Sequence, residues 1–164
     1  MSCVDPAWRQ YSAKTSSEQT SDQMSNPNVP RVLTGQCLCR AVTYAIADDF
    51  HYAMNCHCSN CRRTTGSAFK PFAGIPREKL SIAKGEQHVR TYGGGENFDA
   101  HCRECGSLLY SVVRQGKYVH VAMGTLIDEP SIRPNQHIFV GSKANWHDIT
   151  DDLPQHEAFP TSKS

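Results

Sequence analysis

The chain has 164 residues, a length that suits one domain, and its 17 basic side chains nearly balance its 16 acidic ones, leaving a formal net charge of +1. This balance gives no electrostatic reason to expect a nucleic acid or an anionic membrane as a partner. No apolar run approaches the roughly 20 residues of a membrane span, and residues 1–30 lack the apolar core of a secretory signal. We therefore expect a cytoplasmic protein with no nucleic-acid or membrane partner, and the sequence leaves its oligomeric state open.

Residues 1–30 differ in composition from the rest of the chain. They are rich in Ser, Thr, Gln and Asn and end with Pro27 and Pro30. Such a segment buries too little apolar surface to offset the entropy lost on ordering it. We expect residues 1–30 to form a flexible N-terminal tail and residues 31–164 to form one domain that ends in a short polar tail.

Short strands are predicted throughout this domain, most clearly where Val42, Tyr44 and Ile46 alternate with other residues in the period of a half-buried strand. Residues 108–113 and 118–123 are expected to pair through the loop between them. Further strands are expected over residues 68–75, 80–83, 87–92 and 136–140, and a helical turn over residues 143–147. No amphipathic pattern supports a long helix, so the prediction is a mostly β fold of short antiparallel strands with few short helical turns.

Cysteine is the most informative residue type in this sequence. Of the eight cysteines, seven fall into three clusters: Cys37 with Cys39, Cys56 with Cys58 and Cys61, and Cys102 with Cys105. Gaps of one or two residues are typical of metal sites, and thiolates are ligands that Zn²⁺ prefers. A disulfide framework would require an oxidising compartment, and the spacings differ from those of the familiar ferredoxin iron–sulfur clusters. Zinc is therefore the favoured cofactor.

We refer to Cys37, Cys39, Cys102 and Cys105 as the four-cysteine cluster, and to Cys56, Cys58 and Cys61 as the cysteine trio. The two outer pairs lie far apart in sequence and together would complete a four-thiolate site, which is the pattern of a structural zinc. The trio would then hold a second zinc with an open position, as catalytic sites do. Other distributions of the thiols stay open, with His57 or His101 as a further ligand.

Charged and titratable residues flank the trio. His57 lies between two of its cysteines, where a side chain more often points away from the ion, and its functional alternative is a proton carrier near the open position. Arg62, Arg63 and Lys70 form a small basic run. Such a run is usually a solvated face, and the sharper hypothesis is that it holds carboxylates of an anionic substrate beside the zinc.

The ordered set of motifs resembles the glutathione-dependent formaldehyde-activating enzyme family, which includes the centromere protein V type of domain. The resemblance covers about residues 31–150 and is carried by Trp146 and by residues 35–39, 56–62, 65–69, 102–107 and 123–126. Two residues depart from the family pattern, and neither removes a ligand: Arg40 stands where the family usually has glycine, and His101 stands before the last cysteine pair where a different residue is expected.

This resemblance implies a β-tent zinc-binding fold in which the four-cysteine cluster holds a structural zinc and the trio holds a catalytic zinc. It implies a carbon–sulfur lyase that adds glutathione or a related thiol to formaldehyde or a related small aldehyde, giving S-hydroxymethylglutathione. A zinc with three thiolates is a soft centre that can accept and deprotonate a thiol, which supports this reading. The rival function is a non-catalytic zinc module that binds a partner. A sulfoxide reductase of similar shape would need a reactive cysteine outside both groups, and only Cys3 qualifies.

Overall fold

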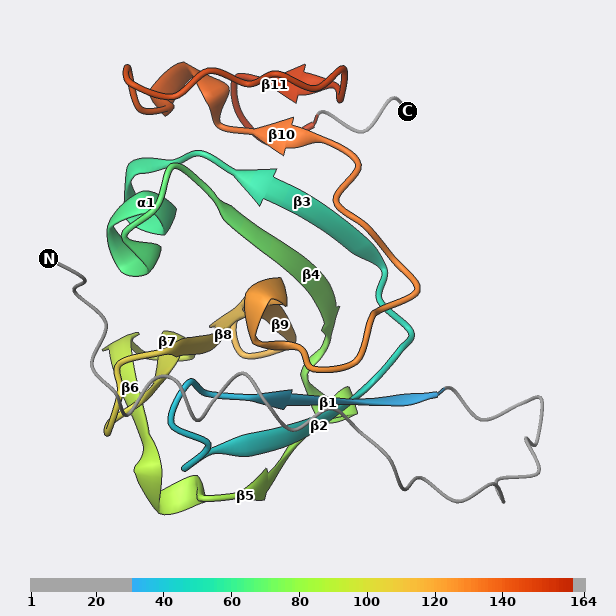
Figure 1. Ribbon diagram of the computed structural model, residues 1–164, viewed down its shortest axis with the longest axis vertical. Coiled ribbons are helices and arrows are strands. Elements are labelled where there is room, and N and C mark those ends of the chain that lie inside the picture. Colours follow the sequence, from blue (N-terminus) through green and yellow to red (C-terminus); the bar gives the residue numbers. More distant parts are fainter. Residues whose placement is uncertain (1–30, 161–164) are drawn as a thin grey trace, which may run out of the picture.

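The computed structural model describes residues 31–160, so the predicted N-terminal tail lies outside the described residues, as do residues 161–164. The described residues form two β-sheets and one short α-helix (Figure 1). The mostly β prediction is therefore confirmed. Most strand pairs are antiparallel as expected, but β10 is parallel to both of its neighbours.

The smaller sheet has the strand order β1-β2-β5, and both of its strand pairs are antiparallel. Its strands are β1 (Val32–Gln36), β2 (Thr43–Ala47) and β5 (Leu80–Lys84). Val42, Tyr44 and Ile46 are buried, while the residues between them are only partly buried. This confirms the strand predicted from the alternation.

The larger sheet has eight strands in the order β11-β10-β3-β4-β9-β8-β7-β6. The predicted pairing of residues 108–113 with residues 118–123 is confirmed by the antiparallel strands β8 and β9. The strands of this sheet are β3 (Tyr52–Cys56), β4 (Lys70–Pro76), β6 (Val89–Gly94), β7 (Asn97–Cys102), β8 (Leu108–Val113), β9 (Tyr118–Ala122), β10 (His137–Ile138) and β11 (Gln155–His156).

Helical segments are short. The α-helix α1 spans Ser59–Thr65, and the 3₁₀ turns are η2 (Arg77–Lys79), η3 (Glu86–His88), η4 (Met123–Thr125) and η5 (Val140–Ser142). None of the described helices is long and apolar enough to cross a membrane.

Two predictions near the C-terminal end of the domain were only partly correct. The strand expected over residues 136–140 is limited to β10, because Phe139 adopts a left-handed backbone conformation (φ 58°) that ends the extended segment, and a further strand, β11, comes later in the chain. The helical turn expected over residues 143–147 is a single hydrogen-bonded turn, in which the His147 amide donates to the Ala144 carbonyl at 3.1 Å. The 3₁₀ turn η5 lies just before it.

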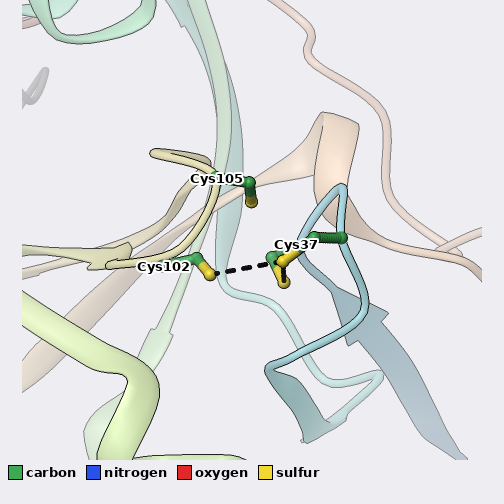
Figure 2. A group of neighbouring side chains, drawn as sticks. Cys37, Cys102 and Cys105 are labelled. Atoms are coloured by element: carbon green, nitrogen blue, oxygen red, sulfur yellow. Dashed lines mark hydrogen bonds between the residues drawn. The ribbon is translucent and has the colours of Figure 1, made fainter.

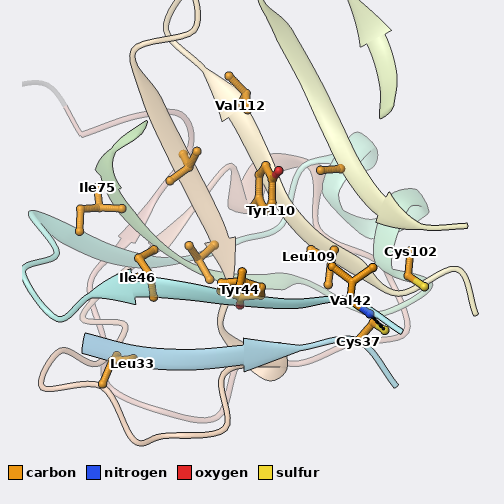
Figure 3. Close-up of a cluster of buried hydrophobic side chains, with 13 residues drawn as sticks. Leu33, Cys37, Val42, Tyr44, Ile46, Ile75, Cys102, Leu109, Tyr110 and Val112 are labelled. Carbon is orange, nitrogen blue, oxygen red and sulfur yellow. Dashed lines mark hydrogen bonds between the residues drawn. The ribbon is translucent and has the colours of Figure 1, made fainter. Parts of the chain in front are cut away.

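The main hydrophobic core lies between the two sheets (Figure 3). From the smaller sheet it receives Leu33, Tyr44 and Ile46, and from the larger sheet Ile75, Leu109, Tyr110, Val112, Val119 and Val121. The rings of Tyr44 and Tyr110 meet edge to face, with centroids 6.4 Å apart. Cys37 and Cys102 belong to the same buried cluster, so the core continues directly into the four-cysteine cluster.

Candidate metal centres and active site

The four-cysteine cluster brings together loops of the two sheets (Figure 2). Cys37 and Cys39 lie in the loop between β1 and β2, while Cys102 ends β7 and Cys105 lies in the turn before β8. The sulfur atoms all lie within 4.8 Å of one another, with 3.6 Å from Cys37 to Cys39 and 3.7 Å from Cys39 to Cys102. A tetrahedral zinc with Zn–S bonds of about 2.3 Å needs sulfurs about 3.8 Å apart, so this donor set fits the ion.

Tight backbone turns shape both halves of this cluster. The Arg40 amide donates to the Cys37 carbonyl at 3.0 Å, and Arg40 itself has φ 62°. This left-handed conformation favours glycine, which gives a physical reason for the glycine usual at that position in the family that the sequence resembles. In the other half, Gly106 has φ 77° and its amide donates to the Cys102 carbonyl at 2.9 Å. The Val42 amide also donates to the Cys37 sulfur at 3.3 Å.

The thiols of this cluster compete for protons because they lie so close together. A backbone hydrogen bond from Ala41 lowers the pKa of Cys39, but burial and the three neighbouring thiols raise it to about 12. At Cys105, burial raises the pKa, yet hydrogen bonds involving Ser107 and Cys39 outweigh it and bring it down to about 6. Four neighbouring thiolates need a cation to offset their charges, and a divalent soft ion supplies that.

The cysteine trio is built by one local segment. Cys56 ends β3, Cys58 is the N-cap of α1, and Cys61 lies in the first turn of that helix. The Cys58 sulfur accepts a hydrogen bond from the Cys61 amide at 3.4 Å, in the manner of an N-cap side chain. The three sulfurs lie within 4.8 Å of one another, and no histidine, aspartate, glutamate or further cysteine among the described residues joins them. The start of a helix thus brings the three sulfurs together.

His57 does not join the trio, because its buried side chain belongs to a chain of hydrogen bonds that leads to the half-exposed Asp151. Its Nε2 lies 2.7 Å from Nδ1 of His137, and Nε2 of His137 lies 3.0 Å from Asp151. If the Asp151 carboxylate accepts from His137, then His137 accepts from His57, and Nδ1 of His57 is left buried without a hydrogen-bond partner. Burial lowers the pKa of His57 to about 4, so the ring is neutral.

A cavity of about 440 Å³ opens beside the trio, whose three cysteines form part of its lining. Its polar lining includes Asn60, Thr64, Lys70, Asp99, Ser111 and His120, and its aromatic lining includes Phe72, Tyr92, Phe98, Phe139 and Phe159. Of the basic run noted in the sequence, Lys70 lines the cavity, whereas Arg62 and Arg63 do not. The cavity is therefore amphipathic and has sulfur ligands at one side.

Several residues around the cavity carry no signal in the sequence. Ser111 and His120 face each other in the β8–β9 ladder, far along the chain from the trio. His120 stacks on Phe72 with ring centroids 4.2 Å apart, and its Nε2 lies 2.9 Å from the Tyr52 hydroxyl. Away from the cavity, His137 is also far along the chain from the trio, and it reaches His57 because β10 pairs in parallel with β3, while Asp151 in turn contacts His137. Only the alternation of strand residues hints at which of them face inward.

Residues 32–142 match the family described as glutathione-dependent formaldehyde-activating enzyme. The chain belongs to this family. A solved structure of a Rhodobacter sphaeroides protein is similar, with 25% identity, 60% of this chain and 92% of that chain covered, and a TM-score of 0.51. Comparison with curated protein sequences finds no match. Proteins of this family bind zinc, and both cysteine groups of this member have the geometry to hold it. At the level of the family, membership supports a function of the glutathione-dependent formaldehyde-activating type.

Proposed function

We propose that this protein adds glutathione, or a related small thiol, to formaldehyde or a related small aldehyde, as a carbon–sulfur lyase-type enzyme. One observation carries this proposal: the trio lines a cavity of about 440 Å³, and no further protein ligand among the described residues joins its three sulfurs. A structural zinc is closed by four protein ligands, whereas a catalytic zinc keeps a position for a ligand from solution. In this proposal the four-cysteine cluster holds a structural zinc and the trio holds a catalytic one.

A zinc held by Cys56, Cys58 and Cys61 would lower the pKa of an incoming thiol. The aromatic side chains of the cavity, among them Phe72 and Phe98, exclude water and hold the carbon skeleton of the thiol. The thiolate sulfur attacks the carbonyl carbon, a C–S bond forms, and the π electrons of the carbonyl move to its oxygen. The proton given up by the thiol is returned to that oxygen, which yields a hydroxyalkyl thioether. Because formaldehyde is strongly electrophilic, positioning and thiolate formation suffice.

The oxidation state of the cysteines agrees with a cytoplasmic location for this reaction. None of the seven cysteines of the described residues forms a disulfide. Cysteines stay unoxidised in a reducing compartment, and the cytoplasm is one that glutathione keeps reducing. We therefore place the reaction in the cytoplasm.

The proposal is tested with protein in which cobalt replaces zinc. Glutathione should strengthen the thiolate-to-cobalt charge-transfer band, and the zinc protein should accelerate adduct formation from glutathione and ¹³C-formaldehyde, followed by NMR. Cys58→Ser is the matched variant, since it removes one trio ligand while leaving the four-cysteine cluster whole. A wild-type protein that neither changes the spectrum nor exceeds the uncatalysed rate would be the non-catalytic zinc module instead.

A further inference from the structure

Lys70 is a buried cation in the wall of the cavity beside the trio. The residue is only 5% exposed, and its Nζ forms a hydrogen bond to Ser111 Oγ at 2.9 Å. No aspartate or glutamate of the described residues forms an ion pair with it. Asp99 lines the same cavity, but its carboxylate accepts from the Thr64 hydroxyl at 3.2 Å. A buried charge is costly unless an opposite charge and hydrogen bonds compensate it.

The ammonium has more donors than its neighbours use. A lysine ammonium carries three N–H donors and no acceptor, and the hydroxyl of Ser111 engages one of them. His120, on the neighbouring strand, cannot offset the charge of Lys70, because an imidazole is either neutral or positive, and burial lowers the pKa of this ring to about 3 so that it is neutral. Among the described residues no second hydrogen bond of this ammonium is found, and Lys70 lines the cavity beside the trio.

Sheet register places this cation next to the sulfur ligands. Lys70 lies directly opposite Cys56 in the antiparallel β3–β4 ladder, and α1 connects these two strands (Figure 1). The cavity beside the trio is lined by all four of the residues concerned, Cys56, Cys61, Lys70 and Ser111. A molecule bound through its sulfur at the trio thus has its other polar groups within reach of the ammonium.

We propose that Lys70 and Ser111 bind an anionic oxygen of the molecule that occupies the cavity beside the trio. This assignment rests on the proposed function, because it takes that molecule to be a small thiol. The oxygen has two sources: a carboxylate of the thiol, or the alkoxide formed when the thiolate adds to the aldehyde. In both cases the ammonium donates a charge-assisted hydrogen bond, and such bonds are about twice as strong as neutral ones. The substrate class is then a thiol with a carboxylate, or any thiol whose adduct oxygen reaches Lys70.

The test uses zinc-loaded Lys70→Met, which keeps an unbranched side chain of similar length and removes the charge. Lys84→Met is the matched control, since Lys84 is an exposed lysine of β5 outside the cavity lining. Calorimetry measures the binding of 3-mercaptopropionate and of its neutral amide, and NMR measures the rate of adduct formation with ¹³C-formaldehyde. Zinc content and circular dichroism are recorded for each variant, and Ser111→Ala should show a smaller loss in the same direction.

If the oxygen is a carboxylate, Lys70→Met weakens the binding of 3-mercaptopropionate by at least about tenfold and leaves the binding of the amide unchanged. If it is the alkoxide, both thiols bind as before, and the rate per bound thiol falls by about a hundredfold, as for loss of an oxyanion donor. Unchanged binding and an unchanged rate would overturn the assignment. It would also be overturned if Lys70→Met lost the trio zinc and weakened the binding of both thiols equally, because Lys70 would then only balance the charge of the thiolates. A wild-type protein that binds the thiols but forms no adduct contradicts the proposed function, while the binding comparison still decides the role of Lys70.

Discussion

His120 is a residue whose protonation state is set by burial. Its ring stacks on Phe72 in the wall of the cavity and accepts or donates one hydrogen bond with Tyr52. Burial lowers the pKa of His120 from 6.5 to about 3, and the positive charges of Lys70 and Arg114 act in the same direction. The neutral imidazole is therefore part of the folded structure at neutral pH.

This pKa makes stability depend on pH with a definite sign. As the pH falls below about 6.5, the unfolded chain takes up a proton at His120, whereas the folded protein does so only near pH 3. The unfolding free energy should thus decrease as the pH falls from about 6.5 towards 3, with a slope of up to about 1.4 kcal/mol per pH unit from this group. His120→Gln, which keeps a partner for the Tyr52 hydroxyl, should reduce this slope in urea denaturation of the zinc-loaded protein. An unchanged slope would show that the low pKa of His120 is not a source of this pH dependence.

Gly35 is the residue that allows β1 to approach the ring of Tyr44. The two residues are directly opposite each other in the β1–β2 ladder, and a Cβ at position 35 would overlap the tyrosine ring atoms. The ring cannot easily move, because Tyr44 is fully buried and its hydroxyl lies 2.8 Å from Oγ1 of Thr125.

Gly35→Ala should therefore lower the unfolding free energy by about 1–3 kcal/mol, the usual cost of overpacking a core. Gly94→Ala is the control, because a Cβ at position 94 meets no atom within 4 Å. Urea denaturation of both variants measures the difference. Equal stability of the two variants would show that the Tyr44 ring relaxes without cost.

At the scale of elements, the segment from β3 into α1 forms the trio by itself. One strand end, one N-cap and one helical turn bring the three sulfurs together, and Gly66 ends the helix in a left-handed conformation (φ 61°). The loop closed by a metal at these positions is short, so binding there restrains little chain entropy. The trio therefore contributes little to holding the rest of the fold.

Cys58→Ser should remove or loosen metal at the trio while the fold survives. Serine is a good N-cap, so it can still accept the hydrogen bond from the Cys61 amide and preserve α1. We expect near-normal circular dichroism, a lower zinc content and the loss of glutathione binding. The zinc count and the binding titration should be made on the same sample, so that loss of metal and loss of fold are separated.

At the scale of the whole molecule, the four-cysteine cluster joins the two sheets. Cys37 and Cys39 come from the β1–β2 loop of the smaller sheet, and Cys102 and Cys105 from the β7–β8 region of the larger one. The hydrophobic core lies between the same two sheets. Metal binding at this point thus holds together parts that are far apart in sequence.

Cys105→Ser should yield insoluble or unfolded protein. Binding at a structural zinc site contributes on the order of 10 kcal/mol to folding, while a domain is stable by only about 5–15 kcal/mol. Circular dichroism and zinc counts of this variant, set beside those of Cys58→Ser, give the answer. If Cys58→Ser unfolds the protein and Cys105→Ser stays folded, the structural and catalytic roles are the reverse of those proposed.

The sequence by itself determined the features that depend on neighbouring residues. The alternation at Val42, Tyr44 and Ile46 predicted a half-buried strand, because side chains of a strand alternate between two faces whatever lies beyond it. The spacing within the trio indicated a metal site, since a few residues of backbone are enough to bring three sulfurs together. The strand pair β8–β9 followed from two strand patterns and a short loop.

Only the tertiary structure decided which distant residues meet. Ser111 and His120 lie beside Lys70 because β4, β9 and β8 are adjacent in the larger sheet. His137 reaches His57 through the parallel pairing of β10 with β3, and the strand predicted at residues 136–140 is cut short where Phe139 turns left-handed. Such contacts depend on strand order and register, which are set by burial of the whole sheet rather than by any local pattern. The wall of the cavity, and with it the place of Lys70, therefore became visible only in the folded protein.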